Sequence, residues 1–255
     1  KFIKSRNIAQ VRKIQRDIHS LYKLDASQYD EERKLVIRKI YDMIPSNMEN
    51  KKKRVIVKNI EHTAGHKQFS DYSEFDYLVN SGVALSVQAI SNPKFPLKES
   101  ESKNLIKLYL SDVGILTDLL YRTNINAVLG DERSVNLGSV YESVVAQELH
   151  AHGFTLHYYD NKQRGEVDFL IDDYDNLTVL PIEVKSGKDY KVHSALDAFL
   201  DTPDYHIKNA IVLSNEQNVH KEHGITYLPV YYVMFLKQDN IPEEDLVIPN
   251  PELEE

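Results

Sequence analysis

Apolar positions recur at helical spacing along the first part of the chain. Between residues 1 and 24 they fall at Ile3, Ile8, Val11, Ile14, Ile18 and Leu21, which predicts an amphipathic helix. A second helix is expected from about Tyr29 to Met43, ended by Pro45 and Ser46. Residues 47–60 fit a third helix, although 54–57 fit a short strand equally well. A fourth helix is expected to begin at Ser70 or Ser73 and to end at residues 80–82, which read Asn-Ser-Gly.

Two β-like runs follow, at residues 83–90 and 105–111, and a loop with Pro93 and Pro96 joins them. Several helices before a long-looped β-ribbon are typical of a winged helix. We therefore expect a helical, winged-helix-like domain over residues 1–116. Such a domain can place a helix in a DNA groove, but many winged helices bind only protein.

The pattern changes after residues 117–135, which are expected to be a connector. Residues 137–150 predict an amphipathic helix, and strand-like runs follow at 154–159, 165–171 and 177–184. A helix near 191–200 and strands at 209–213 and 225–235 complete the order. This order predicts an α/β domain over residues 136–255, in which helices cover the faces of a mixed sheet.

The amino-acid composition indicates the class of protein and its cellular location. The 255 residues are 42% hydrophobic and 27% charged, which is ordinary for a globular protein. The chain has no cysteine, so disulfides and cysteine-based zinc sites are excluded. No apolar stretch approaches the roughly 20 residues of a membrane span, and no signal peptide is recognisable. We expect a cytoplasmic protein, and because the chain begins at Lys1 rather than Met, an upstream domain is possible.

Charge is divided unevenly. Residues 1–68 hold 17 Lys and Arg against 8 Asp and Glu, whereas the remainder holds 14 against 31. A basic first part can contact nucleic acid, and the acidic remainder cannot bind it through bulk charge. Within the basic part, Lys51, Lys52, Lys53 and Arg54 are candidates for nucleic-acid contact, or simply the solvated start of a helix.

The candidate metal-binding and catalytic side chains lie on two predicted strands. Because strand side chains alternate, Glu166 and Asp168 should share one face while Val167, Phe169 and Ile171 share the other. Glu183 and Lys185 should likewise lie on one face. A hairpin around residues 172–176 would bring Asp168 beside Glu183.

Two carboxylates placed together repel each other, and a divalent cation would relieve that repulsion. Mg²⁺ prefers oxygen ligands, and as a Lewis acid it suits phosphodiester hydrolysis. Lys185 could orient the attacking water or stabilise the charge of the phosphate in the transition state. We therefore expect Asp168 and Glu183 to bind Mg²⁺ and Lys185 to act in catalysis.

Asp168 followed by Glu183-Val184-Lys185 resembles the signature of PD-(D/E)XK nucleases. Residues 138–149 and 107–114 are in addition similar to segments of a large prokaryotic family, in which an AAA-type ATPase precedes a winged helix and a nuclease-like C-terminal domain of unassigned function. The resemblance implies a restriction-endonuclease-like fold, a catalytic role for Glu142, and phosphate contacts from Lys188 and Lys191. It implies ATP only for a longer parent protein, because no G-x-x-x-x-G-K-[ST] motif is present.

Two functions from different classes stay open at this point. The first is a Mg²⁺-dependent DNA phosphodiesterase, and the second is an inactive nuclease-fold module that recognises DNA or protein beside an ATPase. A homo-oligomeric scaffold is a weaker third possibility. Glu166 is expected to be a salt-bridge partner, His62 and His66 to lie in a loop without metal, and Tyr227, Tyr231, Tyr232 and Phe235 to belong to a core strand.

Overall fold

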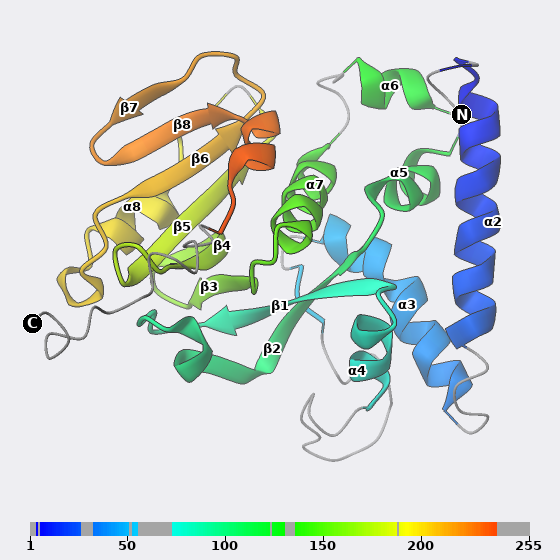
Figure 1. The fold of residues 1–255 in the computed structure, drawn as a ribbon, viewed down its shortest axis with the longest axis horizontal. Coiled ribbons are helices and arrows are strands. Elements are labelled where there is room, and N and C mark those ends of the chain that lie inside the picture. The colour runs from blue at the N-terminus through cyan, green and yellow to red at the C-terminus, as the bar shows by residue number, and fades with distance from the viewer. Residues whose placement is uncertain are drawn as a thin grey trace, which may run out of the picture.

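The computed structural model describes residue 4 and residues 6–26, 33–50, 53–55, 73–122, 124–130, 136–187 and 189–238. Its centre is a mixed eight-stranded sheet with the order β2-β1-β3-β4-β5-β6-β8-β7 (Figure 1). The strands are β1 (Ala84–Ile90), β2 (Glu101–Leu110), β3 (His157–Asn161), β4 (Gly165–Asp173), β5 (Thr178–Lys185), β6 (Ala210–Ser214), β7 (His220–Glu222) and β8 (Ile225–Pro229). The expectation of a mixed sheet with helices is confirmed.

Along the sequence, some helices precede the first strand and others connect one strand to the next. They are α2 (Ile8–Ala26), α3 (Lys34–Glu49), α4 (Ser73–Asn80), α5 (Val113–Tyr121), α6 (Ile125–Leu129), α7 (Gly138–Ala151) and α8 (Ser194–Leu200). Three 3₁₀ turns, η3 (Leu97–Ser100), η4 (Pro203–Tyr205) and η5 (Val230–Phe235), join them. No described helix is both long and apolar enough to cross a bilayer.

The hydrophobic core has two parts. The larger one joins side chains of α3, α4, α5 and α7 to the sheet, and Ile44, Leu116 and Leu149 in it are fully buried. The smaller one joins α8 to the sheet through Leu196 and Phe199, which are also fully buried. Because apolar side chains pack on both faces of the sheet, β6 is buried along its whole length and its sequence is almost entirely apolar.

The β-ribbon expected in the winged-helix-like domain is part of this shared sheet. β1 pairs with β2 antiparallel and with β3 parallel, so it joins the sheet of the second region directly. The backbone N–H of Val55 donates to the carbonyl oxygen of Ile106 at 2.9 Å, which adds residues 53–55 beside β2. The two strands of the predicted ribbon therefore lie in the same sheet as the strands of the second region. The two domain ranges themselves stay a prediction, and residues 117–135 contain the end of α5 and all of α6.

Three local predictions were wrong: the end of a helix at Pro45, the continuation of a strand past Pro229, and the alternation of side chains in β4. α3 continues through Pro45, although a proline inside a helix removes a hydrogen bond, because Ile44 and Met48 on either side are buried in the core. The strand expected over 225–235 ends at Pro229, and η5 follows it. Val167 packs in a different core cluster from Phe169 and Ile171, since the pairing of β3 with β4 shifts register there.

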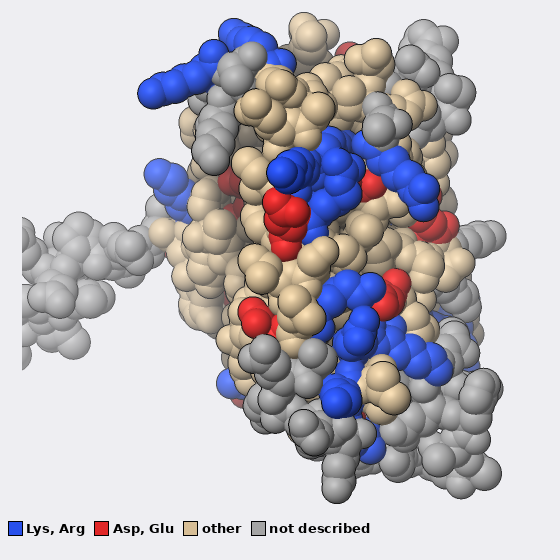
Figure 2. All heavy atoms as spheres, turned by 90° about the vertical axis from the view of Figure 1, so that its right-hand side faces the viewer, with Lys and Arg blue, Asp and Glu red and all other residues tan. Residues whose placement is uncertain are grey.

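The helix α2, which belongs to the basic first part of the sequence, lies on one side of the molecule (Figure 1). α2 runs along the right-hand side of Figure 1, and on that side Lys and Arg outnumber Asp and Glu (Figure 2). Lys13 is exposed there, and Arg16, with 54% of its side chain exposed, pairs with Asp118 at 3.3 Å.

Candidate functional site

Asp168 lies where strands β4 and β5 pair. The two strands form the expected antiparallel hairpin, with Phe169 opposite Ile182. The Oδ2 atom of Asp168 accepts a hydrogen bond from the backbone N–H of Val184 at 2.8 Å. This bond holds a half-buried carboxylate of β4 against the part of β5 that carries Glu183.

Glu183 and Lys185 form an ion pair on β5. The Nζ atom of Lys185 lies 2.8 Å from Oε1 of Glu183, as expected for side chains on the same face of a strand. Glu183 is buried, and among the described residues its Oε2 atom has no hydrogen-bond partner. A buried carboxylate oxygen without a partner is costly, so this atom is open to a cation.

Glu142 approaches the same place from α7. Its side chain is buried, accepts a hydrogen bond from the hydroxyl of Tyr109 at 3.4 Å, and forms an ion pair with Lys53. We call Glu142, Asp168 and Glu183 the carboxylate cluster. One residue of α7, one of β4 and one of β5 supply it.

The carboxylates of the cluster act on one another. Burial raises the pKa of Asp168 well above its ordinary value, and the charges of Glu183 and Glu142 raise it further against the opposing effect of Lys107 and Lys53. Burial also raises the pKa of Glu183, where Lys185 opposes the shift and Glu142 adds to it. Burial and mutual repulsion therefore disfavour the ionised forms of Asp168 and Glu183, a penalty that a bound divalent cation would relieve.

Lys107 of β2 is a member of the site that the sequence reading missed. Its side chain is fully buried, and its Nζ atom lies 2.6 Å from Oε1 of Glu166 and 4.5 Å from the centre of the Tyr158 ring. Burial alone would lower the pKa of Lys107, but Tyr109 and the carboxylates of Glu166, Glu142 and Asp168 raise it above its ordinary value. A signal was available, because Lys107 shares a strand face with Leu105 and Tyr109 in an otherwise apolar run.

The remaining basic candidates are dispersed. Lys51, Lys52 and Lys188 lie outside the described residues. Arg54 pairs with Asp160 at 2.9 Å, beside the ion pair that Lys107 makes with Glu166. Lys191 is exposed, lies 3.4 Å from Glu222 and faces the ring of Tyr227, so it is not part of the carboxylate cluster.

Other predicted residues serve the fold. Glu166 is a salt-bridge partner, as expected, and Tyr227 is buried in β8. Tyr231 and Phe235 lie exposed on η5, so the expectation of a core strand was wrong for them, because the chain turns after Pro229. His62 and His66 lie outside the described residues.

The carboxylate oxygens of the cluster are of the right chemical type to bind a divalent cation, but their present spacing does not form a coordination site. Within the described part of the chain, no three Asp, Glu or His side chains are arranged to hold an ion as they stand. Lys53 forms an ion pair with Glu142, and Lys185 forms one with Glu183. The unpartnered Oε2 atom of Glu183 and the carboxylate oxygens of Asp168 are nevertheless oxygen ligands of the kind that Mg²⁺ takes.

Comparison with known proteins gives two family matches. Residues 2–126 match a family described as a domain of unknown function, DUF8612, and residues 137–233 match another, DUF4143. DUF4143 is found at the C-termini of AAA-ATPase-like proteins. No curated protein and no solved structure matched the chain. Residues 127–136 separate the two matches, and they overlap the segment 117–135 that the sequence suggested as a connector.

Proposed function

We propose that this chain contains a Mg²⁺-dependent phosphodiesterase site that acts on DNA, built on a fold of the PD-(D/E)XK type. The observation that carries the proposal is the convergence of Glu142, Asp168 and Glu183, with Lys185 paired to the last of them. The order α7-β3-β4-β5-α8-β6, with β3, β4 and β5 antiparallel and β6 parallel to β5, supports it.

Each residue has a role that follows from its position. Asp168 and Glu183 would bind the cation, and Glu142 would complete its ligands from α7. A bound Mg²⁺ polarises a phosphate oxygen and lowers the pKa of a bound water. Lys185, whose ammonium already lies beside Glu183, would hold the attacking water or stabilise charge on the phosphate. The basic face along α2 offers contacts for the DNA backbone, and these would weaken with salt.

A second candidate function is a recognition module that does not cut. The observation in its favour is that three lysines, Lys53, Lys107 and Lys185, are ion-paired with carboxylates of the site and its neighbour Glu166. Such pairs can neutralise the site without a metal. In that case the domain would bind DNA or protein for an associated ATPase, and loss of Asp168 would leave binding unchanged.

Calorimetric titration of Mg²⁺ and Mn²⁺ separates the two candidates. The chain should bind a divalent cation, and Glu183→Ala should lose that binding because it removes a buried ligand. Lys185→Ala should keep cation binding yet lose turnover on a DNA substrate. Lys191→Ala is a matched control, since Lys191 pairs with Glu222 away from the cluster and its loss should change neither readout.

Two results would overturn the proposal. If Glu183→Ala and Lys185→Ala both retain cleavage, the cluster is not the active site. If neither the parent chain nor the variants bind a cation or cleave DNA, while DNA binding persists, the recognition module is the better account.

A further inference from the structure

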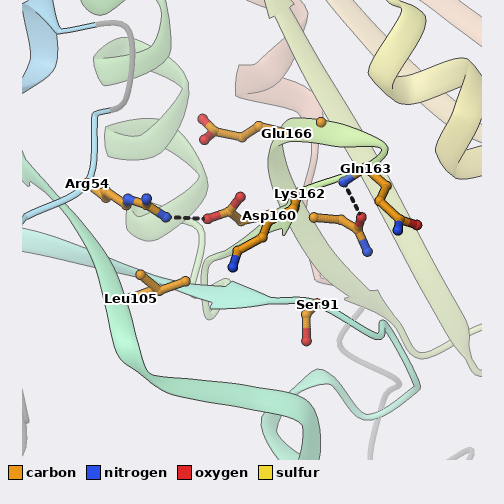
Figure 3. A pocket seen from close by; sticks show the side chains of 9 residues that line it. Arg54, Ser91, Leu105, Asp160, Lys162, Gln163 and Glu166 are labelled. Carbon is orange, nitrogen blue, oxygen red and sulfur yellow. Dashed lines mark hydrogen bonds and ion pairs between the residues drawn. The ribbon is translucent and has the colours of Figure 1, made fainter.

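A pocket of about 710 Å³ opens beside Glu166, which lies two residues before Asp168 in the sequence. The turn between β3 and β4 forms one wall, and Arg54, Leu105 and Ser91 form the other (Figure 3). This volume falls within the range of small-molecule and cofactor sites. We call it the turn pocket.

The turn pocket and the carboxylate cluster share a strand. Glu166 lines the pocket, and Asp168 follows it two residues later on β4, a rise of roughly 7 Å in an extended strand. The buried ammonium of Lys107 is paired to Glu166 at 2.6 Å and acts electrostatically on Asp168. If a phosphate of a polymer is bound at the cluster, the adjacent unit of that polymer would therefore lie at the pocket.

The walls of the pocket carry groups that recognise a nucleobase. Asn161 and Gln163 have side-chain amides, and Asp160 and Glu166 have carboxylates; these two kinds of group read base edges through hydrogen bonds. The guanidinium plane of Arg54, held by Asp160 at 2.9 Å, can stack on a ring. Leu105 adds an apolar contact, and the exposed Lys162 is placed to meet a phosphate (Figure 3).

The turn itself is held in shape before any ligand arrives. The Oδ1 atom of Asn161 accepts hydrogen bonds from the backbone N–H groups of Gln163 and Arg164, at 2.9 Å and 3.2 Å. Because these bonds use the oxygen, the amide nitrogen of Asn161, a residue that lines the pocket, remains available as a hydrogen-bond donor. A turn fixed in this way loses little entropy when it binds a ligand.

A base inside a duplex cannot enter a pocket of this kind without leaving the stack. Extrusion costs energy, and the cost is least where the strand is already single. We propose that the turn pocket binds one unpaired nucleotide, and that the DNA which the cluster acts on is single-stranded at that point. This inference rests on the proposed function and adds the substrate class to it.

Fluorescence anisotropy in EDTA tests the pocket without any cleavage. The probes are a labelled single-stranded DNA of about ten nucleotides and the duplex of the same sequence. Single-stranded DNA should bind about tenfold more tightly than duplex, and Gln163→Ala and Lys162→Ala should each weaken single-strand binding by up to about tenfold. Gln217→Ala and Lys221→Ala change the same residue types, with Lys221 on β7 at the far edge of the sheet, and should leave both affinities unchanged.

The outcomes of this test are separate from those of the metal titration. Equal affinity for single strand and duplex, or equal single-strand affinity in all four variants, would overturn the inference even if the cluster binds Mg²⁺. A selective loss in Gln163→Ala and Lys162→Ala supports the pocket, and it does so even if the titration shows no metal binding. The pocket would then belong to the recognition module.

Discussion

Asp168→Asn should make the protein more stable in the absence of metal. Burial and the charges of Glu183 and Glu142 raise the pKa of Asp168 above its ordinary value of 3.8. The folded protein therefore holds this proton more tightly than the unfolded chain does. Stability should fall as the pH rises from about 3.8 through the raised pKa, and the full cost applies above it.

The size of the effect follows from what asparagine keeps and what it removes. The amide oxygen can still accept the N–H of Val184, a bond worth about 1 kcal/mol, so that contribution stays. The negative charge beside Glu183 and Glu142 is lost. We expect a gain of about 1–2 kcal/mol at neutral pH, the usual range for removing one unfavourable feature. For a chain of this length, that gain raises Tm by roughly 2–8 °C.

Urea unfolding followed by tyrosine fluorescence measures this, because the chain has 16 tyrosines and no tryptophan. The parent protein should lose stability between about pH 4 and neutral pH, whereas the variant should lose less. Mg²⁺ at a hundred times its Kd should then add about 2.7 kcal/mol to the parent and nothing to the variant. Asp17→Asn, an exposed change on α2, serves as the control. The reasoning fails if Asp168→Asn is no more stable than the parent at neutral pH.

Two further changes test the packing around the site and the sheet. Lys107→Met should cost about 2–3 kcal/mol, less than the roughly 3–5 kcal/mol of a fully buried broken pair, because Glu166 stays one-third exposed. Glu166→Gln should cost less in that background than alone, and a double-mutant cycle by urea unfolding that shows no coupling would contradict the pairing. Gly224→Ala should lower stability by about 1–3 kcal/mol, because Gly224 has φ +82° and a Cβ there would collide with the carbonyl oxygen of Lys208. Gly187→Ala, where a Cβ meets nothing within 4 Å, is its control, and equal Tm values for the two variants would refute the steric reason.

Much of the local structure could be read from periodicity. The helices α4 and α7 and the strands β1, β4, β5 and β6 lie close to their predicted ranges, because each carries a clear apolar pattern. The failures came where the tertiary core outweighed a local signal. α3 passes through Pro45 because its buried side chains continue to pack beyond it, and the chain turns into η5 where an apolar run suggested more strand.

The amino-acid sequence by itself determined which side chains could meet. The alternation in β5 and the short turn between β4 and β5 were sufficient to predict Asp168 near Glu183 and Lys185, although the alternation is interrupted in β4. Only the tertiary structure decided what surrounds them. Lys53 and Lys107 are far from residue 168 in sequence, and they reach the cluster because β1 pairs with β3 and draws β2 and residues 53–55 to the same sheet. Local spacing cannot encode such pairings, since they depend on which strand edges meet when the whole sheet forms.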